Sequence, residues 1–303
     1  MDERRRVRIH RPPRSVIFLI GAAALALLLA GCSSASRSSY VFHWNYFFDS
    51  IIHPDRLILA GLTLTVTISI VSQTIGVILG VFAAIGKLSR LRLIRYVANL
   101  YIWVFRGTPL IVQLVFFYFG LSVTRIYLWP DVTIGPLNID GAVQAGIFAL
   151  GVNEGAYMAE IVRAGILSID TGQSEAARAL GMTYGKTMRR IILPQAARVI
   201  IPPLGNEFNN MLKTTSLLFV LSVQELYTVF NIKQGQDFAP FEYFLAAAAW
   251  FLLLTTIWGV FQSWIERRLA TGQAGSGNDD SPGLMSRMIG FRNNSRNQLP
   301  GGR

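Results

Sequence analysis

Residues Leu57–Gly86 read LILAGLTLTVTISIVSQTIGVILGVFAAIG and contain no charged side chain. A helix needs about 20 mostly apolar residues to cross the hydrocarbon core of a bilayer. This stretch therefore predicts a transmembrane helix that is long enough to span the membrane with some tilt.

Five further apolar segments lie on both sides of this stretch. They are Ser15–Gly31, part of Tyr96–Val123, about Gly141–Val162, about Ala197–Val223 (interrupted by Pro202 and Pro203) and Tyr243–Trp264. The composition agrees with embedding in lipid, since 15% of the residues are charged against about 25% in soluble domains. The sequence thus predicts an all-α, polytopic bundle of five core spans plus one extra hydrophobic segment at the N-terminus.

Basic residues concentrate in alternate connecting segments. The rich segments hold Arg4, Arg5, Arg6, Arg8, Arg11 and Arg14, then Lys87, Arg90, Arg92 and Arg95, then Arg163, Arg178, Lys186, Arg189, Arg190 and Arg198, and finally Arg267 and Arg268. Cytoplasmic loops carry such an excess, so both termini are predicted to face the cytoplasm. The net charge of +11 does not indicate nucleic-acid binding, because spans separate the basic segments and they form no single face.

These features predict the organisation of the chain. It comprises a basic cytoplasmic tail at 1–14, an extra span or signal at 15–32, an external segment at 33–56, a membrane domain at 57–269 with a cytoplasmic loop at about 164–196, and a tail at 270–303. The tail is rich in Gly, Ser and Asn, and its low apolar content predicts disorder.

The start of the third span has two interpretations. Arg106-Gly107-Thr108-Pro109 interrupts the apolar run, and proline removes a helix hydrogen bond. In the first, one helix runs from Tyr96 with a kink at this point. In the second, which we prefer, Leu91–Phe105 is an amphipathic helix on the inner surface and the span starts near Pro109.

The N-terminal apolar segment ends in Leu29-Ala30-Gly31-Cys32-Ser33. A basic run, a short apolar stretch and small residues have the form of a secretory signal, and the lone cysteine is similar to the lipid acceptor of a bacterial lipoprotein. The alternative, which we favour, is an uncleaved span. Both interpretations put Cys32 outside.

Polar side chains at membrane depth are candidates for function, because burying them in lipid is costly. The candidates for a substrate path are Asn153, Glu154 and Tyr157 of the fourth span and Asn206, Asn209, Asn210 and Lys213 of the fifth. Carboxylates and amides could bind the ammonium group of a substrate, and Lys213 could bind its carboxylate. The alternative is that these groups join helices by hydrogen bonds. Glu160 lies near Arg163 and the inner surface, which favours an ion pair for it.

A cytoplasmic stretch reads Glu175-Ala176-Ala177-Arg178-Ala179-Leu180-Gly181, followed by Ile191, Leu193 and Pro194. Ser168–Leu180 has good helix propensity, and Gly181 suits a helix stop in the left-handed conformation. A second short helix is expected over Thr187–Ile192, ended by Pro194. Two short helices joined by a glycine turn would make a compact knob, where the small Ala176 and Ala177 allow another surface to approach.

The sequence offers no catalytic or metal site. It has one cysteine and three histidines, all near the N-terminus. Gly181–Thr187 is similar to a phosphate-binding loop, but it has three residues between its glycines instead of four and no preceding strand. No cofactor is therefore expected in this chain.

The spacing of the cytoplasmic stretch matches the Glu-Ala-Ala signature of ABC-importer permeases at every position, from Glu175 to Pro194. More of the chain resembles the polar amino-acid branch of this family, of the histidine, glutamine and arginine type. The resemblance covers roughly Leu57–Leu269, and its motifs include Arg106-Gly107-Thr108-Pro109-Leu110, Gly155-Ala156-Tyr157, Pro194-Gln195-Ala196 and Lys213-Thr214-Thr215-Ser216-Leu217.

The resemblance implies a permease of the bacterial inner membrane that imports a polar amino acid. The Glu-Ala-Ala loop would contact a separate ATPase subunit, which binds the ATP. The other implied partners are a second permease copy or paralogue and an extracytoplasmic amino-acid-binding protein. A secondary transporter without an ATPase is the alternative, but the signature would then have no purpose.

Overall fold

The computed structural model describes residues 40–135 and 137–270. Its internal contacts divide the chain into Met1–Phe42 and His43–Arg303, and the helical bundle lies within the second unit. The predicted N-terminal span, Cys32 and the C-terminal tail from residue 271 onward lie outside the described residues.

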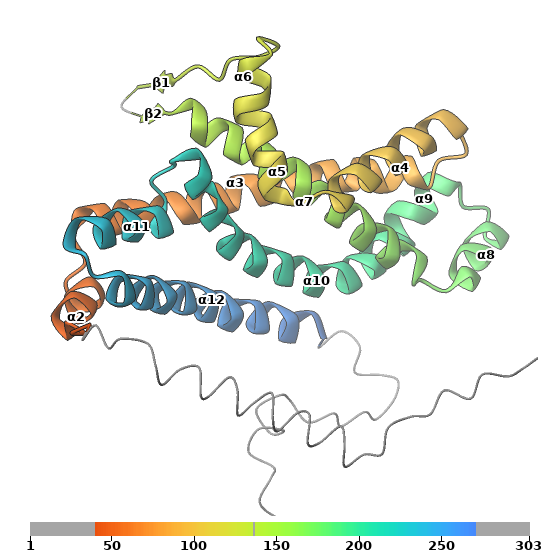
Figure 1. Cartoon of the computed structure of the whole chain (residues 1–303). Helices are drawn as coiled ribbons and strands as arrows, with labels where there is room; N and C mark the ends of the chain where they lie inside the picture. Colours follow the sequence, from red (N-terminus) through yellow and green to blue (C-terminus); the bar gives the residue numbers. More distant parts are fainter. Residues whose placement is uncertain (1–39, 136, 271–303) are drawn as a thin grey trace, which may run out of the picture. The chain divides into compact units, whose positions relative to one another are not determined.

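Helices coincide with each of the five predicted core spans (Figure 1). In chain order the elements are α2 (Trp44–Ile52), α3 (Arg56–Lys87), α4 (Arg92–Gly107), α5 (Leu110–Val115), the π-helical turn η1 (Phe116–Gly120), α6 (Leu121–Val123), β1 (Val132–Ile134), β2 (Leu137–Ile139), α7 (Gly141–Leu167), α8 (Thr171–Ala179), α9 (Tyr184–Thr187), the π-helical turn η2 (Met188–Ile192), α10 (Leu193–Thr214), the 3-10 helix η3 (Thr215–Leu221), α11 (Leu226–Asp237) and α12 (Pro240–Ala270). The sequence did not predict the antiparallel hairpin β1–β2, which pairs Val132 with Ile139.

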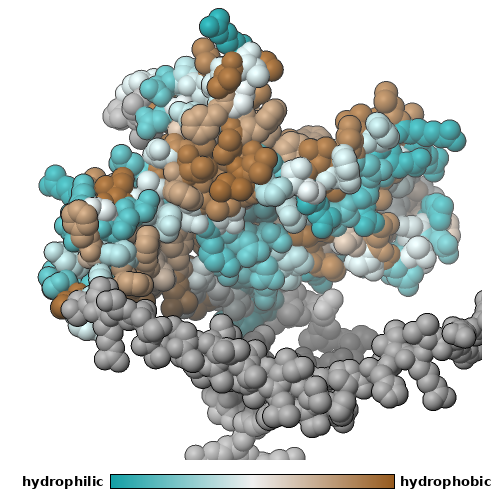
Figure 2. All heavy atoms as spheres, in the orientation of Figure 1, coloured by the Kyte–Doolittle hydropathy of each residue, from teal (hydrophilic) through white to brown (hydrophobic). Residues whose placement is uncertain are grey.

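Two of the described helices, α3 and α12, are long and apolar enough to cross a membrane unaided. Two bent pairs also qualify when each is taken together: α4 with α5–α6, which meet at 107°, and the α9–η3 segment with α11, which meet at 51°. The bend at Thr108-Pro109 separates α4 from α5. Two separate helices with a break before Leu110 are what the second interpretation of the third span predicts. Apolar side chains crowd the surface of α5 and η1, which appears brown in Figure 2.

Two predicted inner connections lie at one end of the bundle and two predicted outer connections at the other, while the hairpin β1–β2 stands apart from both at the top of the view (Figure 1). The turn between α3 and α4 lies at the same end as α8 and α9, whereas α2 and α11 lie at the other end. At the first end, the Lys87 ammonium donates to the Glu160 carboxylate, and an Arg163 Nη2 atom lies 2.9 Å from the other Glu160 oxygen. The predicted ion pair of Glu160 with Arg163 is thereby confirmed within α7, and the bond to Lys87 joins α3 to α7.

Helices α3 and α7 pack closely because α3 carries glycine where α7 crosses it. A Cβ atom on Gly80 would lie 2.3 Å from the Met158 Cβ and 3.0 Å from backbone of the same helix. A Cβ on Gly76 would lie 2.5 Å from the Glu154 Cγ. No side chain larger than hydrogen fits at either position unless the helices separate.

Gly80→Val should therefore destabilise the folded chain. Overpacking of this kind lowers the free energy of unfolding by about 1–3 kcal/mol. Side-chain movement alone cannot relieve it, because part of the obstacle is backbone. Gly259→Val on α12 is the matched control, since a Cβ there would meet no atom within 4 Å. The thermal stability of the purified protein in detergent, monitored by size-exclusion chromatography, tests this prediction. Equal stability of the two variants would show that the close approach of α3 and α7 is wrong.

Helix α10 runs unbroken through Pro202 and Pro203, so the predicted interruption there is wrong. Side chains of α12 bond to carbonyls of this part of α10: Gln262 Nε2 donates to the Pro202 oxygen at 3.2 Å, and Trp258 Nε1 to the Gly205 oxygen at 2.8 Å. The carbonyls freed by the two prolines are those of Arg198 and Val199, four residues earlier, so these bonds join α12 to α10 and do not replace the missing helix bonds. Pro194 likewise lies in the first turn of α10, where proline is tolerated, so it does not end a short helix as predicted.

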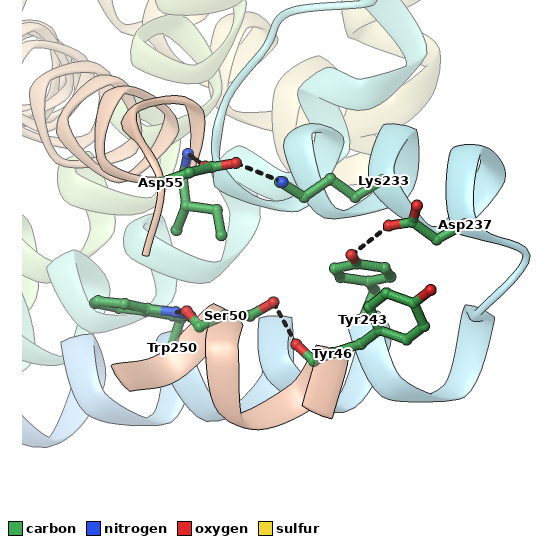
Figure 3. A network of polar contacts seen from close by, with 8 residues as sticks. Tyr46, Ser50, Asp55, Lys233, Asp237, Tyr243 and Trp250 are labelled. Atoms are coloured by element: carbon green, nitrogen blue, oxygen red, sulfur yellow. Dashed lines mark hydrogen bonds and ion pairs between the residues drawn. The ribbon is translucent and has the colours of Figure 1, made fainter. Parts of the chain in front are cut away.

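Polar contacts join α2, α3, α11 and α12 at the outer end (Figure 3). The Lys233 Nζ lies 2.5 Å from an Asp55 carboxylate oxygen, and Trp250 Nε1 donates to the Ser50 carbonyl at 3.0 Å. The other Asp55 oxygen accepts from the Ile58 N–H at 2.9 Å and caps α3. Although partial burial opposes it, bonding to Lys233 and the Ile58 N–H holds the pKa of Asp55 below its ordinary value.

Asp55 should consequently stabilise the outer end in a pH-dependent way. Its contribution is complete above the ordinary aspartate pKa of about 3.9 and is lost as the pH falls through the lowered value. Asn is as good a helix cap as Asp, so Asp55→Asn removes the charge and keeps the cap. We expect a loss of up to about 1 kcal/mol at neutral pH that disappears in strong acid, as measured by thermal unfolding. A pH-independent difference would contradict the role of the ion pair.

Candidate functional site

A cavity of about 350 Å³ opens between α5, α7, α10 and η3. Its walls are formed by Leu110, Leu150, Asn153, Glu154, Tyr157, Glu207, Asn210, Met211, Thr214 and Leu217. Small-molecule pockets range over about 300–1,000 Å³, so the cavity suits a compact ligand. Four of the predicted path residues, Asn153, Glu154, Tyr157 and Asn210, are brought together here.

Glu154 is the most buried charge-bearing side chain in the wall, at 6% exposed. One of its carboxylate oxygens accepts a hydrogen bond from Gln73 Nε2 of α3 at 3.1 Å, which fixes its position from behind. Glu207 of α10 lines the same cavity. Two carboxylates that line one cavity repel each other, so a cationic group between them would be favoured.

Asn153 lines the cavity and also forms hydrogen bonds that stabilise the neighbouring backbone. Its side-chain N–H groups donate to the Phe105 carbonyl at 2.9 Å and to Gln113 Oε1 at 3.0 Å. Gln113 in turn donates to the carbonyl oxygens of Phe105 and Thr108. These amides satisfy carbonyls left free by the break before Pro109, and they hold the bend between α4 and α5 beside the cavity.

An aromatic ring and a guanidinium flank the carboxylates. The Arg106 guanidinium carbon lies 5.2 Å from the centroid of the Tyr157 ring, which is within the range of a cation–π contact. Tyr157 lines the cavity, whereas Arg106 contacts its ring and is not part of the cavity wall. The charged groups of the wall are therefore the two carboxylates.

The other predicted path residues lie elsewhere. Asn206 accepts from Gln262 of α12 at 3.1 Å, and Lys213 lines a separate cavity of about 320 Å³ with Tyr227 and Phe251. The Asn209 Oδ1 atom is buried and accepts no hydrogen bond among the described residues. Successive helical residues differ by about 100°, so the face toward the cavity is centred on Glu207.

Two important side chains were missed in the sequence. Gln73 and Gln113 are both buried. Gln113 is the one polar residue of α5, whereas Gln73 lies between Ser72 and Thr74 of α3. The cost of a polar group in lipid was the signal that would have found them. Among the described residues, no group of three or more His, Cys, Asp and Glu could hold a metal ion.

The predicted cytoplasmic knob is formed by α8, α9 and η2. Gly181 has a φ of +71°, as predicted for a glycine helix stop. The Met182 N–H donates to the Ala177 carbonyl at 3.0 Å and the Gly181 N–H to the Arg178 carbonyl at 2.9 Å. These two hydrogen bonds together form a Schellman motif, which sets the direction in which the chain leaves α8. Helix α8 begins at Thr171, three residues after the predicted start.

The signature residues of the knob divide into exposed and buried sets. Glu175, Ala176, Gly181, Leu193 and Pro194 are exposed, and Ile191 is half-buried. Ala177 is 1% exposed, so it packs inside the knob and cannot receive another surface as predicted. A small residue is needed there because α8 lies directly on α9 and η2.

Two large apolar side chains project from the knob. Leu180 is 81% exposed and Tyr184 is 79% exposed. They lie on either side of Gly181 in the sequence, and Glu175 and Ala176 of the same knob are also exposed. Exposed aromatic and aliphatic groups at such a position are typical of an interaction surface.

Comparisons with known proteins agree with these features. Residues 76–271 match the family described as "Binding-protein-dependent transport system inner membrane component". The chain is 39% identical over 264 residues to the arginine transport system permease protein ArgU of Corynebacterium glutamicum, covering 84% of this chain and 80% of that protein. It is 34% identical over 233 residues to the glutamine transport system permease protein GlnP of Escherichia coli K12, covering 75% and 98% respectively.

A solved structure gives the same result. The fold matches a chain of an amino acid ABC transporter crystallised with histidines, with a TM-score of 0.65, 40% identity, and coverage of 73% of this chain and 98% of that one. A methionine transporter, MetNI, matches with a TM-score of 0.57 at 18% identity, which is a likeness of fold alone. The chain therefore belongs to the family of binding-protein-dependent transport system inner membrane components, and it has the fold of an ABC-transporter permease.

Proposed function

We propose that this chain is the membrane-spanning subunit of an ATP-driven importer for polar amino acids in the bacterial inner membrane. Its own cavity would pass the substrate, and a separate ATPase would supply the energy. The observation that carries the proposal is the pairing of a cavity holding Glu154 and Glu207 with a cytoplasmic knob on the same two helices, α7 and α10.

The connection between knob and cavity is short. Helix α7 carries Glu154 and leads through Ser168 into α8, and η2 leads directly into α10, which carries Glu207. A displacement of the knob would therefore move both walls of the cavity. Such a rigid connection is what a permease without a nucleotide site needs, because the work must enter through a surface.

The partners follow from the same reasoning. An ATPase subunit would bind the knob through Leu180 and Tyr184, with Glu175 at the rim. An extracytoplasmic amino-acid-binding protein would deliver the substrate at the opposite end, and a second permease copy or paralogue would complete the path. The names of the relatives include arginine, glutamine and L-cystine transport, which supports an amino-acid substrate.

Among amino acids, the two carboxylates of the cavity favour a cationic side chain. We expect Glu207→Gln to weaken arginine binding by about 10- to 100-fold, which corresponds to loss of one charged hydrogen bond, and to leave glutamine binding nearly unchanged. Equilibrium dialysis of labelled arginine and glutamine with the purified permease–ATPase complex measures both.

Glu160→Gln is the matched control, because Glu160 pairs with Lys87 and Arg163 outside the cavity. Equal losses for arginine and glutamine in Glu207→Gln would contradict a cationic substrate. Unchanged binding of both would mean that the substrate does not use this cavity.

A further inference from the structure

Helix α2 has three different faces around its axis, and the transport function uses none of them. At about 100° per residue, Trp44, Phe48 and Ile52 fall within about 80° of one another, and all three are exposed. These three residues form the α2 stripe. Asn45 and Asp49, which are also exposed, follow directly beside it and make a narrow polar face.

The third face of α2 is fixed to the bundle (Figure 3). The ring centroid of Tyr46 lies 5.7 Å from that of Tyr243 of α12, and Trp250 Nε1 donates to the Ser50 carbonyl at 3.0 Å. The rest of this face packs against the apolar core between α3, α11 and α12. Since these contacts hold one side of the helix, the α2 stripe cannot turn inward without breaking them.

The α2 stripe is a continuous apolar patch. Its members are 57% (Trp44), 49% (Phe48) and 63% (Ile52) exposed, and the rings of Trp44 and Phe48 lie 5.8 Å apart. Single exposed apolar residues are common on any protein. An apolar stripe beside a polar face on one short helix is instead typical of a helix that lies at a membrane surface.

The position of α2 in the fold agrees with such a surface. The two described helices that are long enough to cross a membrane unaided, α3 and α12, both begin beside it. Their first two turns expose the apolar side chains of Leu57 and Leu245, and the Asp55–Lys233 ion pair lies at the same end. Apolar, charged and aromatic groups occur together where a span enters the head-group region.

We propose that α2 is an interfacial anchor whose stripe lies among the lipids of the outer leaflet, with Asn45 and Asp49 toward the water. A lipid surface fits the α2 stripe better than a second protein does. The exposed parts of its three side chains amount to roughly 300 Å², if a whole large side chain offers about 150–250 Å². A standard protein–protein interface takes about 800 Å² from each partner.

The proposal is tested by spin labels on single cysteines of the full-length permease in liposomes. Cys32 is the one cysteine of the chain, so Cys32→Ser provides the background. Labels at Phe48→Cys and Ile52→Cys should collide several-fold more often with oxygen, which concentrates in lipid, than with a water-soluble nickel chelate. Labels at Asn45→Cys and Asp49→Cys on the same helix are the matched controls, and they should show the opposite preference.

Two results would overturn the proposal. If all four labels collide mainly with the nickel chelate, the α2 stripe faces water. If the labels at Phe48 and Ile52 are shielded from both reagents, another protein surface covers the stripe, either from a second copy or from the N-terminal part of this chain. Size-exclusion chromatography shows which variants are folded, and either stripe position alone is enough to decide between these results.

Discussion

Replacing Gly181 by valine will abolish the stimulation of ATP hydrolysis by substrate in the assembled transporter. Gly181 has a φ of +71°, where a side chain costs about 1–2 kcal/mol and a β-branched one is strongly disfavoured. Valine would drive the backbone out of the Schellman motif, and α9 would leave α8 in another direction. The positions of Leu180 and Tyr184, the exposed residues on either side of the turn, would then change relative to each other.

Gly185→Val is a close control for this experiment. A Cβ on either glycine would meet no atom within 4 Å, but only Gly181 has the positive φ. The two variants therefore add the same side chain to the same exposed knob and differ in backbone strain. ATPase stimulation and co-purification of the ATPase should be lost in Gly181→Val and kept in Gly185→Val. Normal stimulation in both would show that energy enters the permease by another route.

Replacing Glu154 by glutamine will reduce substrate transport while the complex stays assembled. Glutamine keeps the shape of the side chain and can still accept the hydrogen bond from Gln73, so the variant removes little except the negative charge. A hydrogen bond to a charged group contributes about 1.5–3 kcal/mol, and its loss predicts a roughly 10- to 100-fold lower rate at limiting substrate. Uptake of labelled amino acid into proteoliposomes measures the effect.

Asn206→Leu serves as a comparison in the same assay. Asn206 was predicted to line the path with Glu154, but it bonds to Gln262 of α12, away from the cavity. Its replacement should leave uptake close to wild type. A larger loss in Asn206→Leu than in Glu154→Gln would move the path from the α7–α10 cavity to the face between α10 and α12.

The sequence alone predicted the helices and the main features of the knob. Long apolar runs and the alternation of basic loops can be recognised along the sequence without knowing which helices are neighbours. For this reason all five predicted core spans coincide with helices. The turn at Gly181 was predictable because few residues other than glycine end a helix in this way. The ion pair of Glu160 was predictable because Arg163 is one helical turn away.

Features that depend on which helix lies beside which were beyond the sequence. The stripe of Asn206, Asn210 and Lys213 is continuous on α10, but different neighbours cover its two sides: α7 and the cavity on one, α12 on the other. Ala177 was expected at the surface and is buried for the same reason, since only the fold shows that α9 and η2 cover it. Pro202 and Pro203 were expected to interrupt a helix that in fact runs through both of them.

The measurement that tests the central claim most directly is uptake of labelled arginine by proteoliposomes that contain the complete transporter. The binding protein and arginine are supplied outside, and ATP is enclosed or omitted. The account predicts accumulation that requires enclosed ATP and falls sharply in Glu154→Gln. Accumulation without ATP, driven by an ion gradient and unaffected by Gly181→Val, would contradict it and identify a secondary transporter.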